Sequence, residues 1–256
     1  MIFYFSGLGN TKYVAKEIGA AIFETPRFIP DYLPEAVEDE TTESVGFLFP
    51  IYSWGVPPIV LDFIKRLPEK LVNNWREKEL PVWTVCTYGD ETGGAIDILR
   101  KALKKRGLRL QGAWSVRMPN TYVLLPGFDV DPKEIEKEKL SEAKGRISEI
   151  ARKIKDGCWE DDYHTGSFPA LRTKLIFPLF VKYGINAKKW HHTNACVKCG
   201  RCIKACPVNN ISMGETGPLW GEDCTSCLAC FHNCPYHAVE YGKITKNKGQ
   251  YVCPLK

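Results

Sequence analysis

Eight of the eleven cysteines in this 256-residue chain lie between residues 196 and 234. They form two groups, each with the spacing C-x2-C-x2-C-x3-C and each followed at once by a proline, Pro207 or Pro235. The second group repeats the first at an offset of 28 residues at all four positions, so the stretch is an internal repeat. The groups are Cys196, Cys199, Cys202 and Cys206, and Cys224, Cys227, Cys230 and Cys234.

This spacing predicts two 4Fe-4S clusters, because in such a run three cysteines reach one cluster and the fourth ligates the other. Zinc is the natural competitor, but a zinc ribbon uses cysteines in pairs and would leave the third and fourth unexplained. Disulfides are disfavoured because a chain of this length can bury an adequate core without them. We therefore expect a first cysteine set of Cys196, Cys199, Cys202 and Cys234, and a second cysteine set of Cys224, Cys227, Cys230 and Cys206. Roughly the last 65 residues closely resemble the bacterial two-cluster ferredoxins.

The formal charge of +5 is concentrated in the C-terminal part of the chain. Residues 186–256 contain nine Lys or Arg and four Asp or Glu, whereas residues 1–185 contain 26 of each. Eight ligand thiolates and two oxidised cluster cores would change the charge by −8 and about +4, which leaves the loaded chain near +1. The basic formal charge therefore does not indicate a nucleic-acid-binding protein.

The composition, 44% hydrophobic and 25% charged, is that of a globular chain. No apolar run approaches the length of a membrane-spanning helix. The first residues, MIFYFSGLGN, lack the basic lead of a signal peptide and are read as a buried strand. We expect a cytoplasmic protein, and its eight thiolates suit a reducing, anaerobic interior.

A second motif stands at the start of the chain. Ile2–Phe5 is an apolar run, followed by a turn from Ser6 to Thr11 and a helical pattern over residues 12–21. Strand, glycine turn and helix can form a phosphate cradle, because the N–H groups at the helix N-terminus point at an anion. A dinucleotide fingerprint would need a third glycine at Lys12, and a P-loop would need a Gly-Lys-Ser/Thr ending, so neither fits. The alternative is a tight turn without a ligand.

The turn resembles the FMN-binding loop of flavodoxins, usually Ser/Thr-x-Thr-Gly-x-Thr. It matches at Ser6, Gly9 and Thr11 and departs at Leu8, where the family supplies a hydroxyl. The departure removes one hydrogen bond to the phosphate and lowers the expected FMN affinity, but it leaves the backbone donors in place. The resemblance implies that the FMN phosphate is held by Ser6, Gly7, Leu8, Gly9, Asn10 and Thr11.

Two further loops follow predicted strands. Val45–Pro50 is an apolar strand that leads into residues 51–58, and Pro81–Cys86 is a strand that leads into residues 87–94. Because the carboxyl ends of parallel strands share one edge of a sheet, these loops should converge with the first one. The candidate cofactor contacts in them are Pro50, Ile51, Tyr52, Ser53, Trp54 and Gly55, and Thr87, Tyr88, Gly89 and Asp90.

An isoalloxazine ring needs aromatic faces and backbone hydrogen bonds, and these loops offer both at Tyr52, Trp54, Gly55, Tyr88 and Gly89. By resemblance to flavodoxins, the loop after the third strand covers one face of the flavin. The loop after the fourth strand holds its pyrimidine edge and other face. Gly55 is the candidate for a peptide that reorients to accept the hydrogen of flavin N5. The alternative for Trp54 and Tyr88 is a pair of ordinary half-buried loop aromatics.

Alternating strand and helix patterns predict an α/β fold for residues 1–155. Further strands are expected at Arg27–Ile29 and Arg109–Met118, and a helix at 131–155 with Asp131 as its N-cap. Together with the strands above, they predict a flavodoxin-like five-stranded parallel sheet of order 2-1-3-4-5 with helices on both faces. The acidic residues 31–43 are expected to form a surface loop.

The motifs divide the chain into a flavodoxin-like FMN-binding domain (1–155), a connector (156–190) and a small α+β ferredoxin-like domain with two 4Fe-4S clusters (191–256). The apolar run Leu175–Val181 in the connector is interrupted by Pro178 and is too short to span a bilayer. It is expected to pack between the domains, and the alternative is contact with a membrane edge or a partner. This arrangement resembles the flavodoxin/ferredoxin fusion proteins. The resemblance implies FMN and two 4Fe-4S clusters in one electron relay.

The predicted function is electron transfer. FMN can hold one or two electrons whereas each cluster passes one, so such a protein links two-electron and one-electron redox partners of the ferredoxin, flavin or oxidoreductase type. Two alternatives stay open. A flavin-dependent reductase of a small substrate lacks support from a nicotinamide fingerprint or an acid/base pair near the loops. In a redox sensor, the clusters would serve structure or signalling.

Overall fold

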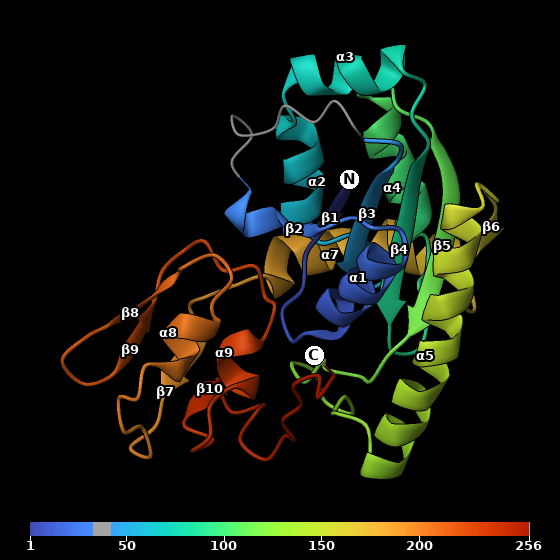
Figure 1. The fold of residues 1–256 in the computed structure, drawn as a ribbon. Helices are drawn as coiled ribbons and strands as arrows, with labels where there is room; N and C mark the ends of the chain where they lie inside the picture. The colour runs from blue at the N-terminus through green and yellow to red at the C-terminus, as the bar shows by residue number, and fades with distance from the viewer. Residues whose placement is uncertain (33–41, 256) are drawn as a thin grey trace.

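The computed structural model describes residues 1–32 and 42–255, so most of the predicted acidic loop at 31–43 lies outside the described residues. A parallel sheet with the strand order β2-β1-β3-β4-β5-β6 forms the larger part of the molecule (Figure 1). Its strands are β1 (Ile2–Tyr4), β2 (Pro26–Phe28), β3 (Val45–Pro50), β4 (Val82–Tyr88), β5 (Leu110–Arg117) and β6 (Asp161–Asp162).

The first five positions of this sheet follow the predicted order 2-1-3-4-5, which confirms the flavodoxin-like topology. The sixth strand was not predicted. Although β6 is only two residues long, it pairs in parallel with Ala113 and Trp114 of β5. An ion pair fixes this edge, since Arg146 Nη1 lies 2.8 Å from the Asp162 carboxylate. The start of the predicted connector is therefore part of the sheet.

Helices cover both faces of the sheet because successive strand residues point to opposite sides. Phe3 and Phe47 pack on one face against the apolar stripes of α2, α3 and α4. Tyr4 and Leu48 pack on the other face against α1 and α5. The helices are α1 (Asn10–Ala21), α2 (Pro58–Arg66), α3 (Glu69–Glu77), α4 (Ala95–Lys104) and α5 (Lys133–Lys155), with a short 3-10 turn, η1 (Ile29–Asp31).

The predicted N-cap of α5 is wrong. Pro132 occupies the N-cap position, and the Asp131 carboxylate makes no capping hydrogen bond. It binds the Lys139 ammonium at 2.8 Å and accepts a hydrogen bond from the Asn120 backbone N–H. The burial of a lysine on the inner side of α5 explains the difference, because a buried ammonium requires a carboxylate partner.

The connector is helical from residue 169 to residue 184, and we call this segment the connector helix. It consists of α6 (Pro169–Leu171), the π-helical turn η3 (Arg172–Ile176), α7 (Phe177–Leu179) and the π-helical turn η4 (Phe180–Gly184). In the described part of the chain, no helix combines the length and apolar character needed to cross a bilayer.

The ferredoxin-like domain lies beside the sheet near the C-terminal ends of its strands (Figure 1). It contains β7 (Trp190–His192), α8 (Arg201–Ala205), β8 (Ile211–Met213), β9 (Pro218–Trp220), α9 (Ala229–His232) and β10 (Val239–Tyr241). β7 pairs antiparallel with β10, and β8 pairs antiparallel with β9. Two short two-stranded antiparallel sheets and two short helices thus frame the cysteine repeat.

The ferredoxin-like domain shares its core with the loop that joins β5 to α5. Val123 and Leu124 of this loop are buried in the same cluster as Phe231 of α9. The neighbouring His232 places its Nε2 atom 2.9 Å from the Thr121 carbonyl, and its Nδ1 atom accepts the Tyr251 N–H at 3.0 Å. The two domains are therefore held together by apolar packing and by a buried histidine with both ring nitrogens in use.

Candidate functional site

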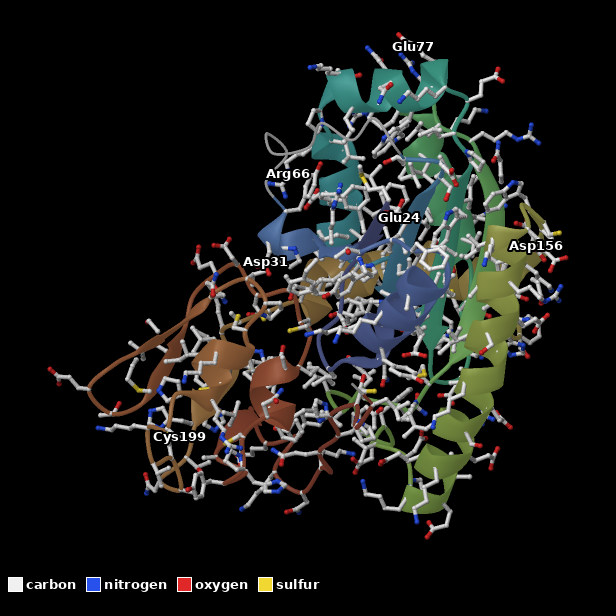
Figure 2. All side chains as sticks on the ribbon, in the orientation of Figure 1. Glu24, Asp31, Arg66, Glu77, Asp156 and Cys199 are labelled. Atoms are coloured by element: carbon white, nitrogen blue, oxygen red, sulfur yellow. The ribbon has the colours of Figure 1, made fainter. Side chains whose placement is uncertain are left out.

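Four cysteines of the repeat surround one small cavity in the ferredoxin-like domain. They are Cys196, Cys199, Cys202 and Cys234, the members of the first cysteine set. Cys202 and Cys234 are buried, whereas Cys199 is exposed and lies on the side of this domain away from the sheet (Figure 2). Four cysteine side chains around one cavity supply the number and type of ligands that a 4Fe-4S cluster takes.

The other four cysteines also face one another. Burial raises the pKa of the Cys227 thiol to about 11, and the nearby Cys206 and Cys224 thiols act in the same direction. Burial likewise raises the pKa of Cys230 well above its ordinary value, with Cys227, Cys224 and Cys206 among its neighbours. Thiols that resist ionisation to this degree need a bound metal to hold them as thiolates, so the second cysteine set also suits a cluster. Among the described residues, no three His, Cys, Asp or Glu side chains lie close enough together to hold a single metal ion.

The backbone repeats at the same offset as the cysteines. Lys198 and Gly200 in the first half have positive φ, at 55° and 73°, and so do Ser226 and Leu228 in the second half, at 54° and 63°. These left-handed residues curl the chain between cysteines, and Gly200 and Leu228 stand at the N-caps of α8 and α9. Leucine bears a conformational cost there that glycine avoids.

The cysteine that follows each short helix receives the same backbone hydrogen bond. The Asn210 N–H donates to Cys206 Sγ at 3.3 Å, and the Ala238 N–H donates to Cys234 Sγ at 3.2 Å. Hydrogen bonds to ligand sulfurs are one of the means by which a protein adjusts cluster potential. Cys206 and Cys234, the last cysteines of the two runs, therefore have equivalent backbone environments.

The second cysteine set lies directly against the loop that follows β1. A Cβ atom on Gly7 would come within 2.6 Å of the Cys227 carbonyl oxygen, so the two backbones are in contact. Cys227 and Tyr52 both pack against the main core of the sheet domain and line the same cavity. Burial raises the pKa of the Tyr52 hydroxyl well above its usual range, and Cys227 and Cys224 add to the effect.

The loop from Ser6 to Thr11 has the geometry of an anion cradle. Gly9, at a φ of 98°, precedes the first residue of α1, and its N–H donates to Ser6 Oγ at 3.1 Å. The hydroxyl of Thr11 is buried and lies 2.7 Å from the hydroxyl of Thr87. Because the first N–H groups of a helix have no intrahelical acceptor, the start of α1 offers free donors to an anion.

A cavity of about 110 Å³ lies between this loop and the carboxyl ends of β3, β4 and β5. Eleven of the sixteen predicted cofactor residues line it, namely Ser6, Gly7, Leu8, Asn10, Thr11, Pro50, Ile51, Tyr52, Thr87, Tyr88 and Gly89. The remaining wall consists of Cys227 and the residues 118–122 after β5. Sequence reasoning missed this last segment, although the rule that loops after parallel strands converge applies equally to the strand at 109–118.

The other five predicted residues lie elsewhere. Gly9 lines a different cavity, and Ser53, Trp54, Gly55 and Asp90 do not line the smaller one. The indole of Trp54 faces the connector helix, where Nε1 donates to the Glu91 carboxylate and the ring lies against the Arg172 guanidinium. Phe177 of the same helix occupies the space beside Gly55.

Thr173 of the connector helix ties these two loops together. Its hydroxyl donates to the Trp54 carbonyl at 3.0 Å and accepts the Gly94 N–H at 2.8 Å. The loops after β3 and β4, both expected to contact a cofactor, are thus fastened to the connector helix.

The chemistry of the smaller cavity fits a flavin phosphate, because the loop presents backbone donors and hydroxyls. Its volume of about 110 Å³ is less than the ~300–1,000 Å³ of typical cofactor sites. The amide of Asn120 crowds Gly89, which narrows the cavity where a ring would lie. A flavin therefore requires these loops to move apart.

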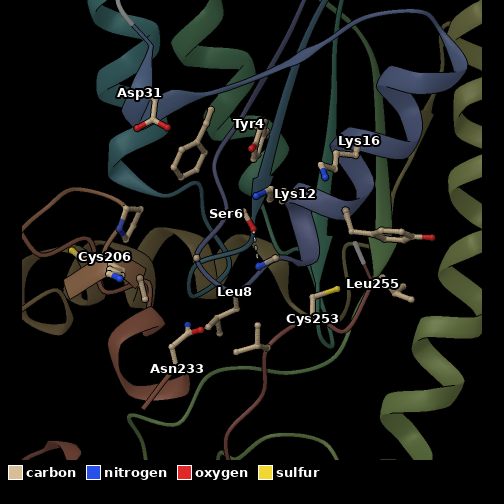
Figure 3. A pocket seen from close by; sticks show the side chains of 18 of the residues that line it. Tyr4, Ser6, Leu8, Lys12, Lys16, Asp31, Cys206, Asn233, Cys253 and Leu255 are labelled. Atoms are coloured by element: carbon tan, nitrogen blue, oxygen red, sulfur yellow. Dashed lines mark hydrogen bonds between the residues drawn. The ribbon is translucent and has the colours of Figure 1, made fainter. Parts of the chain in front are cut away.

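A larger cavity of about 760 Å³ lies on the other side of the same loop (Figure 3). Ser6, Gly7, Leu8 and Gly9 form part of its wall, and Cys206 of the second cysteine set forms another part. Three lysines and one aspartate line it, which favours an anion: Lys12, Lys16, Lys204 and Asp31. The loop is therefore open to ligands from this side as well.

Comparisons with known proteins agree with the cysteine spacing. The model of a protein family described as "4Fe-4S dicluster domain" matches residues 195–238. No curated protein sequence matches the chain.

Several solved structures resemble the N-terminal part. The two-electron reduced flavodoxin of Megasphaera elsdenii is 20% identical, with a TM-score of 0.36 over 57% of this chain and 99% of that one. A flavodoxin from the domain Archaea is 17% identical, with a TM-score of 0.37 over 60% and 97%. The Trp repressor binding protein of Bacillus subtilis is 17% identical, with a TM-score of 0.37 over 56% and 95%. At these scores the fold assignment rests on the strand order. The N-terminal part therefore has a flavodoxin-like sheet topology, and residues 195–238 match the 4Fe-4S dicluster domain.

Proposed function

We propose that this protein transfers electrons between FMN, bound at the loop from Ser6 to Thr11, and two 4Fe-4S clusters ligated by the first and second cysteine sets. The contact between Gly7 and Cys227 carries the proposal, because it brings the second cysteine set to the flavin loop. The first cysteine set lies farther out and ends at the exposed Cys199. This order supports a relay from the flavin loop through the second set and the first set to the surface.

The chain itself contributes binding and orientation. The N–H groups at the start of α1 and the Ser6 hydroxyl would hold the phosphate. The cysteines would hold the clusters, and the half-buried ring of Tyr52, which lines the same cavity as Cys227, would exclude water from the space between flavin and cluster. When bound, a flavin exchanges one or two electrons while each cluster exchanges one, so the protein can join the two kinds of chemistry.

We also propose the redox partners of the protein and the cellular environment in which it works. Its donors and acceptors would be other redox proteins, of the ferredoxin, flavin or oxidoreductase type, and not nucleic acids. Two clusters and many thiolates favour a reducing, anaerobic cytoplasm. A reductase that turns over a small substrate is the second candidate, since the cavity of about 760 Å³ beside Cys206 has room for one.

Analysis of anaerobically purified protein tests both halves of the proposal. We expect about eight iron and eight sulfide per chain, with one FMN. Iron without flavin would overturn the flavin half, and flavin without iron would overturn the cluster half. A matched pair of variants tests the order: Cys227→Ser should disturb the absorption spectrum of the bound flavin, whereas Cys199→Ser should lower iron content and leave that spectrum unchanged.

A stopped-flow experiment separates the carrier from the reductase. Reduced nicotinamide dinucleotide that bleaches the flavin rapidly without a second protein would contradict a pure carrier. Photoreduced protein that fails to pass electrons to any soluble acceptor would favour a sensor instead.

A further inference from the structure

The connector helix presents a row of large apolar side chains to solvent. Phe168, Leu171, Leu175, Leu179 and Tyr183 are exposed by 77%, 61%, 57%, 51% and 64%. Leu171, Leu175, Leu179 and Tyr183 recur every four residues, which places them along one face of the helix, and Phe168 immediately precedes its first residue. We call these five residues the apolar stripe. Soluble proteins rarely expose a contiguous apolar surface of this kind unless it binds something.

The apolar stripe does not pack against the flavodoxin-like domain, because the opposite face of the connector helix makes that contact. Phe177 is buried against Gly55, and Phe180 contacts the ring of Tyr52 at a centroid distance of 6.2 Å. Arg172 forms an ion pair with Glu91. The helix is thus fixed to the flavodoxin-like domain by one side while its stripe points outward.

The charged residues of the connector helix and of the segment that follows it are all cationic. No Asp or Glu occurs between Asp162 and Glu215 in the sequence, so the connector helix has no acidic residue. Lys174 and Lys182 lie on the helix itself and are exposed, and the exposed Lys188 and Lys189 follow it. An apolar stripe with cations along it is the composition of a helix that lies in the interface of a membrane.

We infer that the connector helix attaches the protein to the surface of a bilayer that contains anionic lipids. The apolar stripe enters the boundary between headgroups and acyl chains, and the lysines pair with lipid phosphates. The helix lies along the membrane and does not cross it. A second copy of the chain fits this face less well, because a symmetric dimer would bring the same uncompensated lysines together.

Attachment in this orientation has a structural consequence. The inner face of the helix contacts the loops that contain Tyr52, Trp54 and Gly94. These loops would then lie next to the bilayer surface. The inference does not depend on which cofactor the loops hold.

Cosedimentation of the cluster-loaded protein with lipid vesicles tests the inference under anaerobic conditions. We expect binding to vesicles of phosphatidylcholine with phosphatidylglycerol, weak binding to phosphatidylcholine alone, and loss of binding as salt is raised. Leu175→Glu/Leu179→Glu and Lys174→Glu/Lys182→Glu should each weaken binding by about tenfold or more. The control Lys101→Glu/Lys104→Glu reverses two exposed lysines on α4 and should bind like the unchanged protein.

All the substituted residues are exposed, and unchanged cluster absorption would show that each variant is folded. Absence of binding to the anionic vesicles would overturn the inference. So would equal loss of binding in the α4 control. A concentration-dependent dimer that Leu175→Glu/Leu179→Glu converts to a monomer would assign the stripe to a second copy of the chain instead.

Discussion

The backbone of Gly7 touches the backbone of Cys227. A Cβ atom on Gly7 would lie 2.6 Å from the Cys227 carbonyl oxygen and 2.9 Å from its Cβ atom. Only a residue without a side chain permits this approach. The loop that we propose to bind the flavin phosphate and a cysteine that we propose to bind a cluster are therefore separated by no intervening side chain.

Substitution of Gly7 should loosen this contact. Gly7→Ala forces one backbone away from the other, and overpacking of this kind costs ~1–3 kcal/mol. A fall in the denaturant midpoint of the folded, cluster-loaded protein would measure it. Gly145→Ala is the matched control, because a Cβ there meets nothing within 4 Å and should leave stability unchanged or slightly raised. Equal changes of the denaturant midpoint in Gly7→Ala and Gly145→Ala would show that the contact between Gly7 and Cys227 does not stabilise the fold.

The ion pair between Asp131 and Lys139 is the second target. The side chains are exposed by only 10% and 1%, and their charged atoms lie 2.8 Å apart. Asp131→Ala leaves a buried ammonium without its nearest partner and should cost ~3–5 kcal/mol of unfolding free energy. Glu134→Gln changes an exposed carboxylate in the first turn of α5 and should cost less than ~0.5 kcal/mol. If Asp131→Ala lowered the unfolding free energy by less than ~1 kcal/mol, the Lys139 ammonium would have to be solvated by water in the folded protein.

His232 joins the two domains through its two ring nitrogens. Since Nδ1 accepts the Tyr251 N–H, the ring proton resides on Nε2 and is donated to the Thr121 carbonyl. His232→Ala leaves both backbone groups without a partner and should destabilise the protein by ~3 kcal/mol. Hydrogen exchange should rise at Tyr251 and in the loop after β5. The exposed His191 supplies the control, and His191→Ala should leave exchange at both places unchanged.

The lysines of the larger cavity should favour phosphate-bearing ligands. Lys12 and Lys16 line this cavity next to the loop from Ser6 to Thr11. Lys12→Glu/Lys16→Glu should weaken binding of FMN by about tenfold and leave binding of riboflavin, which has no phosphate, nearly unchanged. Fluorescence titration of flavin-free protein measures both affinities. Lys101→Glu provides the control on α4, and a parallel loss of FMN and riboflavin affinity would argue against a charge effect.

Much of the candidate site could be predicted because its motifs are local. Ligation of a cluster depends on the spacing of cysteines along a few residues, and the positive-φ residues Lys198 and Ser226 repeat at that same spacing. The strands at β1, β3 and β4 were predicted from short apolar runs, and their order follows from the usual winding of parallel strands. The roles of Asp131 and Trp54 could not be predicted from local pattern, because Asp131 pairs with the buried Lys139 and Trp54 packs against Arg172 in the folded chain.

By itself, the sequence determined that the chain has two four-cysteine runs and a strand–glycine turn–helix motif, because both follow from the chemistry of neighbouring residues. Only the tertiary structure decided that the second cysteine set meets that turn. It also decided that the connector helix covers the loops after β3 and β4 while its apolar stripe stays exposed. These relationships depend on how the two domains and the connector helix pack against one another, and the pattern of apolar residues along each segment does not specify that packing.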